Sequence, residues 1–448
     1  MARIGSCRRE IPGGLLSTGT VDHWNPNLEE QCSGLHAACE SLEARRKHGL
    51  NQFLEAGFPG RKDEEWRYTP LRSVAEGEYS SKLSVEGQLP GDDELATSSD
   101  IRLVLINGRF REDLSDLTAL PDTVKVVGLS RSLETSADSV VTDLNRWIPL
   151  VDHPFQNIGD ALLEDGLVIT AEGNVDARIH IVHGQDGSES AGSSHVSGLI
   201  RLSGGAQLEV LEEFRSRGKS LANIRWGMEI GSGCEFRRQR IVRPGCDVLY
   251  HGTRVELGEK AVFRDLIAGS GARLVRNEIH AILAGPGGHV DLLGGYVSNG
   301  DEIVDHHTTI EHAVADCTSR EIYRGVLGGD SRGAFTGMIH VHQDAQRTDA
   351  EQSNDAILLS RSAEMNTRPR LEIYADDVKC THGATVGELD DDSIFYLRSR
   401  GVSLEEARRM LVRAFTAEVF EELENEALKE QFIEQLQEAM PTAVDLRQ

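Results

Sequence analysis

The sequence predicts a mainly β protein whose core is a stacked β-solenoid with α-helical segments at both ends. Strand patterns dominate residues 165–385, and helical patterns lie on either side of them. The chain holds 45 glycines but only 5% aromatic residues, a balance typical of turn-dense β structure. A turn motif also recurs about every 27 residues within the strand-rich part. A fixed period in the range of roughly 20–50 residues indicates a solenoid of stacked repeats.

The repeated motif runs from an apolar residue through a glycine or polar turn to a second apolar residue. One unit is too small to bury its inward face alone, so neighbouring units must stack. A β-sandwich with evenly spaced turns is the alternative, but the copies share a turn pattern as well as a spacing. Three clear copies are followed by three looser ones, at 202–208, 230–236, 257–263, 283–290, 327–335 and 359–365.

A disordered leader and a small helical domain are predicted before the core. Residues 1–27 show no periodicity and form the leader. Apolar residues at helical spacing predict a helix at about 28–56, which Gly57 ends. Residues 80–98 are rich in serine, glycine and acidic residues, which is typical of a linker. The N-terminal helical domain and its linker therefore span 28–98.

The β-helix core is predicted at 99–387 and a C-terminal helical domain at 388–448. The core opens with a strand at Ile101–Ile106, which ends in an Asn107-Gly108 turn. Further on, Ser403-Leu404-Glu405-Glu406 is a capping box, a signature of a helix start. The C-terminal helices would cap the last strand edge of the solenoid, and a second interpretation adds a docking surface for a partner protein.

Charge and cysteine usage define the expected surroundings of the protein. Asp and Glu number 73 against 47 Lys and Arg, giving a net charge of -26 that repels nucleic acids and anionic membranes. No apolar run approaches the roughly 18–20 residues of a membrane helix, and Ile11-Pro12-Gly13-Gly14 replaces the apolar segment of a secretory signal. The 7 cysteines form no closely spaced framework of disulfides. We expect a cytoplasmic protein with neither a nucleic-acid nor a membrane partner.

Sequence motifs of nucleotide binding and of hydrolysis are incomplete or absent in this sequence. Gly218-Lys219-Ser220 resembles the end of a phosphate loop, but Glu213 stands where the first glycine should be. No G-x-G-x-x-G motif follows a strand at a helix start, and no G-x-S-x-G elbow is present. We therefore expect a chain that binds no nucleotide and is not an enzyme.

The strongest candidate for chemistry is Lys379-Cys380-Thr381-His382-Gly383-Ala384-Thr385. Cys380 and His382 are two residues apart, so on a strand both side chains point to one face. A thiolate beside an imidazole binds iron or zinc, or forms a reactive thiol. Because a tetrahedral metal site takes four ligands, this pair would be a half-site that another chain completes. The structural alternative is a buried cysteine with a hydrogen-bonded histidine.

Two further histidine groups also suggest metal ligands. They are Asp305-His306-His307 with His312, and His340-Val341-His342, in which the two histidines would share a strand face. Neither group contains a cysteine or the spaced carboxylates that would define a coordination geometry. We interpret them as polar residues on a solvated face or at a subunit contact. Three other cysteines are expected to pack as small apolar residues, namely Cys234, Cys246 and Cys317.

The run 371–387, which contains Cys380 and His382, resembles the C-terminal signature of the SufD branch of the SufB/SufD family of iron–sulfur cluster assembly proteins. Residues 394–401 extend this resemblance. Two upstream segments, 305–308 and 348–350, are similar to segments that both branches share, and residues 61–70 resemble the SufD N-terminal region.

The resemblance implies a right-handed parallel β-helix core flanked by N-terminal and C-terminal α-helical domains. It implies a non-catalytic scaffold that pairs with SufB through the β-helix and docks the ATPase SufC through its C-terminal helices. A transient iron–sulfur cluster, or iron, would form at the interface with SufB. His382 and the neighbouring Cys380 would be its metal ligands from this chain, while SufB supplies the main sulfur-accepting cysteine.

Two other functions remain open at this point. One is a SufB-like homodimeric scaffold, and the sequence leaves open whether the isolated chain forms a homodimer. This sequence has no cysteine-rich run of the SufB kind, which favours SufD. The other is a β-helix enzyme acting on polysaccharides. Its usual acidic substrates would be repelled by the net charge of -26.

Overall fold

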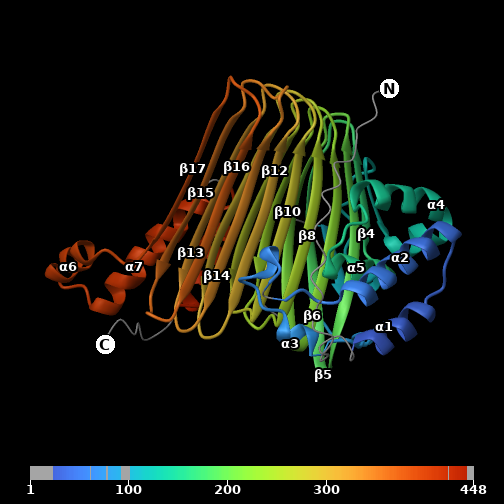
Figure 1. Ribbon diagram of the computed structural model, residues 1–448, viewed down its shortest axis with the longest axis horizontal. Coiled ribbons are helices and arrows are strands. Elements are labelled where there is room, and N and C mark those ends of the chain that lie inside the picture. The colour runs from blue at the N-terminus through green and yellow to red at the C-terminus, as the bar shows by residue number, and fades with distance from the viewer. Residues whose placement is uncertain (1–23, 61, 77–78, 92–100, 422, 441–448) are drawn as a thin grey trace.

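The chain forms a parallel β-solenoid with two walls and with helices near its first and last turns (Figure 1). This computed structural model describes residues 24–60, 62–76, 79–91, 101–421 and 423–440. The predicted parallel β-helix with helical ends is confirmed. The leader predicted at 1–27 lies outside the described residues as far as residue 23.

Each full turn of the solenoid contributes one strand to each wall, and every strand pairs in parallel with its equivalent in the next turn. Wall A contains β7 (Glu235–Val242), β9 (Val262–Ser270), β11 (His289–Ser298), β13 (Thr318–Leu327), β15 (Asp349–Leu358) and β17 (Lys379–Gly387). Wall B contains β8 (Val248–Leu257), β10 (Leu274–Leu283), β12 (Ile303–His312), β14 (Arg332–Val341) and β16 (Glu364–Ile373).

The first turns use longer strands that take part in both walls. β6 (Gln207–Ile230) pairs with β7 along its first part and with β8 along its last. β5 (Asp176–Ser203) precedes it and pairs with β1 (Ile101–Ile106) and β4 (Leu167–Glu172). As predicted, β1 ends in a turn at Asn107 and Gly108. After this turn β2 pairs antiparallel with β1, and β3 pairs antiparallel with β4. β2 and β3 span Arg109–Phe110 and Val124–Gly128.

Each turn of the solenoid has about the number of residues that the spacing of the sequence motif predicted. Motif copies at 202–208, 230–236, 257–263 and 283–290 all lie at the corner that leads into a wall A strand. The copies at 327–335 and 359–365 were assigned wrongly, because they lie at the opposite corner, which leads into wall B. Both corners join two inward-facing apolar positions through a short turn, so they resemble one another in sequence. The wall A strands begin 27 to 31 residues apart, at Glu235, Val262, His289, Thr318, Asp349 and Lys379.

Alternation along the strands builds the core between the two walls. Side chains point to opposite faces in turn, and the parallel register keeps each inward position inward from one turn to the next. Phe236 and Phe263 stack in this way, with ring centroids 5.9 Å apart. Where a large side chain enters, its neighbour is small: a Cβ on Gly198 would lie 2.2 Å from the ring of Trp226.

Helices of the N-terminal region pack mainly on the early turns of the solenoid. The helix predicted at 28–56 is two helices, because Gly34 follows the first one and its amide caps Glu30. The helices and 3₁₀ turns of this region are α1 (Trp24–Ser33), α2 (Glu40–Ala56), η1 (Glu64–Trp66), α3 (Arg72–Ala75), η2 (Glu112–Leu114), α4 (Leu129–Trp147) and α5 (Pro154–Ala161).

The segment around η1 is fastened to the outer face of wall B. The Arg276 guanidinium lies 3.9 Å from the ring centroid of Trp66 and donates to the Glu65 carbonyl at 2.9 Å. It also pairs with Asp305 at 2.5 Å, and Asp305 accepts a hydrogen bond from Thr69. These contacts join the N-terminal region to β10 and β12.

The C-terminal helices are α6 (Asp391–Ser399), α7 (Leu404–Ala417), η3 (Glu418–Phe420) and α8 (Glu426–Glu438). The last three lie on the outer face of wall A over β9, β11 and β13, whereas α6 packs against α7 and projects beyond the last strands in Figure 1. Ser403 caps α7 as predicted, with its hydroxyl accepting from the Glu406 amide at 3.1 Å. These helices cover the side of wall A and, contrary to the prediction, do not cap the last strand edge, and no described residue pairs with that edge.

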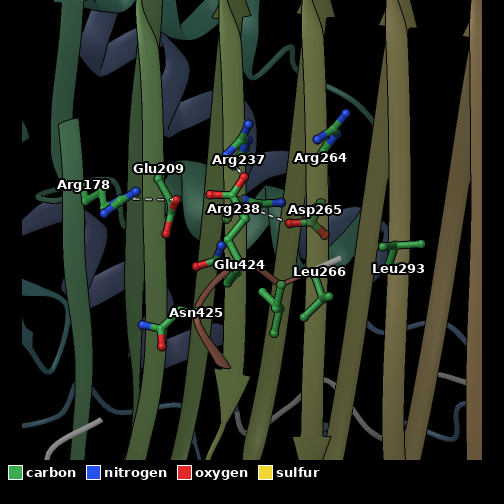
Figure 2. Close-up of a pocket in the computed structure, with 12 residues that line it drawn as sticks. Arg178, Glu209, Arg237, Arg238, Arg264, Asp265, Leu266, Leu293, Glu424 and Asn425 are labelled. Atoms are coloured by element: carbon green, nitrogen blue, oxygen red, sulfur yellow. Dashed lines mark hydrogen bonds and ion pairs between the residues drawn. The ribbon is translucent and has the colours of Figure 1, made fainter. Parts of the chain in front are cut away.

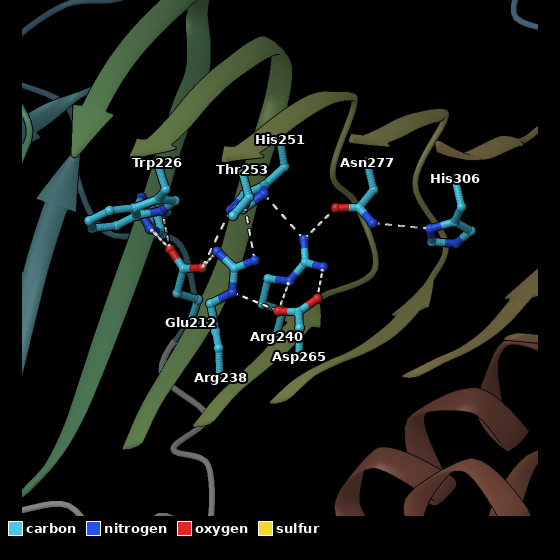
Figure 3. A network of polar contacts seen from close by, with 10 residues as sticks. Glu212, Trp226, Arg238, Arg240, His251, Thr253, Asp265, Asn277 and His306 are labelled. Atoms are coloured by element: carbon cyan, nitrogen blue, oxygen red, sulfur yellow. Dashed lines mark hydrogen bonds and ion pairs between the residues drawn. The ribbon is translucent and has the colours of Figure 1, made fainter. Parts of the chain in front are cut away.

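Charged and polar groups also fill part of the space between the walls (Figure 3). Arg238 donates to Asp265 at 2.6 Å, and Arg240 pairs with the same carboxylate. Arg240 also donates to Asn277 at 2.5 Å, whose amide donates to His306 at 3.3 Å. All five side chains are buried. An ion pair in this setting is costly to break, because the remaining charge has no water to solvate it.

Replacing Asp265 with Ala is expected to destabilise the protein by about 3–5 kcal/mol, because Arg238 and Arg240 lose their shared carboxylate. Burial raises the pKa of Asp265, but the two arginines outweigh burial and hold it below its usual value. The stabilisation is therefore present at neutral pH and is lost as the pH falls through the acid range. Thermal unfolding followed by circular dichroism measures the change.

Asp113→Ala is the matched control, since it removes an exposed carboxylate paired with Arg111. Its unfolding midpoint should stay close to that of the wild type. Equal midpoints for Asp265→Ala and the control would contradict a structural role of the buried network.

Candidate functional site

The last turn of the solenoid is open on the side away from the preceding turns. β17 pairs with β15, and β16 pairs with β14. Among the described residues, neither strand has a hydrogen-bonded neighbour on its other edge. Most of β17 is exposed, whereas the equivalent strands of earlier turns alternate between buried and partly buried residues. Figure 1 shows β17 as the outermost strand of this end.

Cys380 and His382 both lie on β17, on its inward face. The register places Cys380 over Ala350 and His382 over Gln352, and both of these β15 residues are buried between the walls. In an inner turn these two positions would be covered. Here Cys380 is half-buried and His382 is exposed. The structure therefore brings the two predicted residues together at the open mouth of the interior.

The thiol of Cys380 lies in an apolar setting and contacts a core cluster that includes Val341 and Ala375. Burial raises the pKa of Cys380, and the negative charge of Asp349 raises it further. The cysteine is therefore mainly a protonated thiol at neutral pH. Binding a metal ion or accepting sulfur would require a partner or an incoming cation that favours the thiolate.

The other predicted histidine groups do not meet at this site. Asp305 and His307 lie 3.1 Å apart under the N-terminal segment, while His306 points between the walls. Burial lowers the pKa of His306 to about 3, so it is neutral. His312 is also buried and contacts the Ser319 hydroxyl at 2.9 Å. These residues make structural contacts within the chain, and the interpretation of the group as a solvated face is wrong for Asp305, His306 and His312, which are all buried.

His340 and His342 share an outer face of wall B, as predicted, with ring centroids 4.7 Å apart. Each contacts a carboxylate, His340 that of Glu372 and His342 that of Glu311. In the described part of the chain, no group of three or more His, Cys, Asp or Glu side chains is placed to hold a metal ion. The three cysteines expected to pack as apolar residues are buried, namely Cys234, Cys246 and Cys317.

A pocket of about 400 Å³ lies between wall A and the segment that precedes α8 (Figure 2). Its lining is rich in arginines that already have carboxylate partners. Arg178 pairs with Glu209, and Arg237 pairs with Glu424 across the pocket. Neither Cys380 nor His382 lines it. We interpret the pocket as part of the contact between the solenoid and the C-terminal helices.

Two residues next to the site were missed in the sequence. Gln352 lies directly behind His382, and Glu321 lies one further turn behind Gln352. Their Nε2 and Oε2 atoms are 2.6 Å apart. The signal was present, because 321, 352 and 382 are spaced by one solenoid turn. It required the register of each turn, which a loose repeat motif does not define.

Comparison with known proteins gives the family. Residues 182–415 match the model for the SUF system FeS cluster assembly SufBD core domain, and residues 29–181 match the SufBD protein N-terminal region. The chain belongs to the SufBD family of the SUF iron–sulfur cluster assembly system.

Individual relatives agree with this assignment. The iron-sulfur cluster assembly protein SufD of Escherichia coli K12 is 29% identical over 427 residues, which cover 93% of this chain and 98% of that protein. A SufBD family protein of Synechocystis is 24% identical over 86% of this chain and 88% of its own length. Bacillus subtilis SufD is 32% identical over 34% of this chain and 35% of that protein.

None of the helices in the described part of the chain has the length and apolar character that a bilayer crossing needs.

Alkylation of Cys380 by iodoacetamide is expected to be slow at pH 7 and to accelerate as the pH rises, because the raised pKa keeps the thiol protonated. Asp349→Asn removes the nearby negative charge and should increase the rate at a fixed pH. Mass spectrometry of the peptide that contains Cys380 measures the rate, and Cys380→Ser identifies the signal. A slower reaction in Asp349→Asn would contradict the assigned electrostatics.

Proposed function

We propose that this chain is the SufD-type scaffold subunit of a SUF assembly complex, acting in the cytoplasm without catalytic activity of its own. Its last solenoid turn would pair with a SufB subunit, and its C-terminal helices would dock the ATPase SufC. Iron and sulfide are the cargo of this complex. The observation that carries the proposal is the position of Cys380 and His382 on an open strand edge.

The two edge strands differ in a way that favours β17 as the pairing edge. β16 contains Pro369, which has no amide proton, and charged side chains at Arg368 and Arg370. Proline and charge are features that protect an edge against pairing. β17 has one charged residue, Lys379, at its first position. A second solenoid that adds a strand beside β17 would cover Cys380 and His382.

The ligand chemistry also requires a second subunit. One thiolate and one imidazole leave a tetrahedral iron with two open positions. Groups on the partner would fill them, so a cluster could form only in the assembled complex. Neutral imidazole binds iron and releases it on protonation. This suits a scaffold that must pass its cargo on.

The proposed SufC surface is on α6, where two aromatic side chains face solvent. Phe395 is 74% exposed and Tyr396 is 56% exposed. Aromatic residues of this kind are typical anchors of protein interfaces. The Arg400 guanidinium lies 3.5 Å from the Tyr396 ring centroid and adds a charged group beside it.

His382→Ala is expected to reduce the iron and sulfide retained by a complex reconstituted with SufB and SufC to the level of a complex without this chain. Assembly should persist, because the substitution leaves the β17 backbone unchanged. Iron and sulfide analysis measures the cargo, and native mass spectrometry measures the assembly. His340→Ala, a histidine on the outer face, is the control. Full iron retention in His382→Ala would remove His382 from the mechanism.

Phe395→Asp is expected to weaken binding of SufC by about tenfold or more, because a charge replaces an exposed aromatic anchor. Pairing with SufB should be unaffected. Binding is measured by co-purification with tagged SufC and by calorimetry. Val151→Asp changes an exposed apolar residue in the N-terminal region and is the control. Equal SufC affinity in the two variants would move the docking surface away from α6.

A further inference from the structure

Three polar side chains form one column along the interior of wall A. Glu321 on β13 is in register with Gln352 on β15, which is in register with His382 on β17. Paired residues of parallel strands in register point to the same face of the sheet, so all three face the interior. Glu321 and Gln352 are at most 1% exposed. The column begins in the core and ends at the open turn.

The side-chain amide of Gln352 forms a hydrogen bond through its NH₂ group but none through its carbonyl oxygen. Its Nε2 donates to Glu321 Oε2 at 2.6 Å. Its Oε1 atom is buried and has no hydrogen-bond partner among the described residues. A carboxylate only accepts hydrogen bonds, so an ionised Glu321 holds the NH₂ end of the amide and directs the carbonyl end elsewhere. Leaving a buried carbonyl unpaired is costly.

A glycine in the opposite wall leaves room for the Gln352 side chain. Gly337 of β14 faces it, and a Cβ added there would lie 2.2 Å from Gln352 Nε2. The amide therefore occupies the space that a larger residue at 337 would fill. The register places this amide next to the position of His382 on β17.

We propose that Gln352 is a positioning residue for His382: the ring turns toward the interior so that its N–H donates to Gln352 Oε1, the carbonyl oxygen that has no partner among the described residues. This bond fixes one tautomer and leaves the other ring nitrogen with its lone pair directed out of the open turn. Histidines that bind metals commonly donate their second N–H in this way, and loss of the acceptor typically costs about 10–100-fold in metal affinity. The inference rests on the proposed role of His382 as an iron ligand.

The test observes the His382 ring in the full-length chain without any partner or metal. Protein labelled with ¹⁵N in its histidine rings is studied by long-range ¹H–¹⁵N NMR at pH 8.5, and His382→Ala assigns the signals. Burial raises the pKa of Glu321 to about 7, so this pH keeps its carboxylate ionised. The wild type should show one protonated and one unprotonated ring nitrogen. Gln352→Leu should show averaged nitrogen shifts, because the tautomers then exchange.

Two variants keep the test decisive if Gln352→Leu does not fold. Gln352→Asn shortens the side chain by one methylene group and withdraws the acceptor. In the double variant Glu321→Gln with Gln352→Glu, the amide at position 321 donates to the carboxylate at position 352. That carboxylate can still accept from the His382 ring, so the double variant should retain the single tautomer. Glu351→Gln changes the outward face of the same strand and should resemble the wild type. A single tautomer retained in Gln352→Asn or Gln352→Leu overturns the inference.

A second readout separates this inference from the proposed function. Gln352→Asn in the complex with SufB and SufC should retain iron about 10–100-fold more weakly than the wild type. If the NMR result holds but His382→Ala and Gln352→Asn both keep full iron retention, the proposed function fails while the positioning contact stands. If His382→Ala loses iron but the tautomer is unaffected by Gln352, only the positioning role fails.

Discussion

The structure depends on the parallel in-register pairing of each solenoid turn with the next. Pairing gives every backbone amide of an inner strand a partner and keeps inward positions inward for the whole length of the solenoid. The arrangement is stable only where both neighbours are present. The last turn has one neighbour within the described part of the chain, so β16 and β17 expose both a backbone edge and the interior. The same constraint that builds the core therefore also creates the site.

The interior carries more charge than a simple apolar core. Asp265 with its two arginines, and Glu321 with Gln352, lie where water cannot reach. Replacement by apolar residues is often neutral or stabilising in such places, so stability alone does not explain these groups. The Glu321 column ends at His382, at the open turn. The Asp265 network lies in earlier turns, and its contacts connect the two walls.

Much of the fold could be predicted from sequence because its cause is local and repeated. The period between wall A strands and the Asn107-Gly108 turn are set by nearby residues, and both were recognised. The break at Gly34 was missed, since the apolar spacing continues across it. The corner that contains 327–335 was assigned wrongly because the two corners have similar patterns.

The candidate site was predicted only in part. Cys380 and His382 are two residues apart, so their shared face follows from strand geometry alone. Gln352 and Glu321 were missed because their proximity depends on pairing between turns, which single-residue motifs do not encode. Asp305 and the neighbouring histidines were interpreted as polar residues on a solvated face or at a subunit contact, but Asp305 is buried and pairs with Arg276 beneath Trp66. That contact joins segments more than two hundred residues apart and could not be inferred from local pattern.

The central claim is that the last turn is an incomplete turn that a second subunit completes. Amide hydrogen exchange of the peptide covering 379–387, measured by mass spectrometry with and without SufB, tests it most directly. The account predicts rapid exchange in the chain alone and strong protection of β17 when SufB is added, with little change in β13. Equal exchange of β17 in the two samples, with SufB bound, would contradict the account.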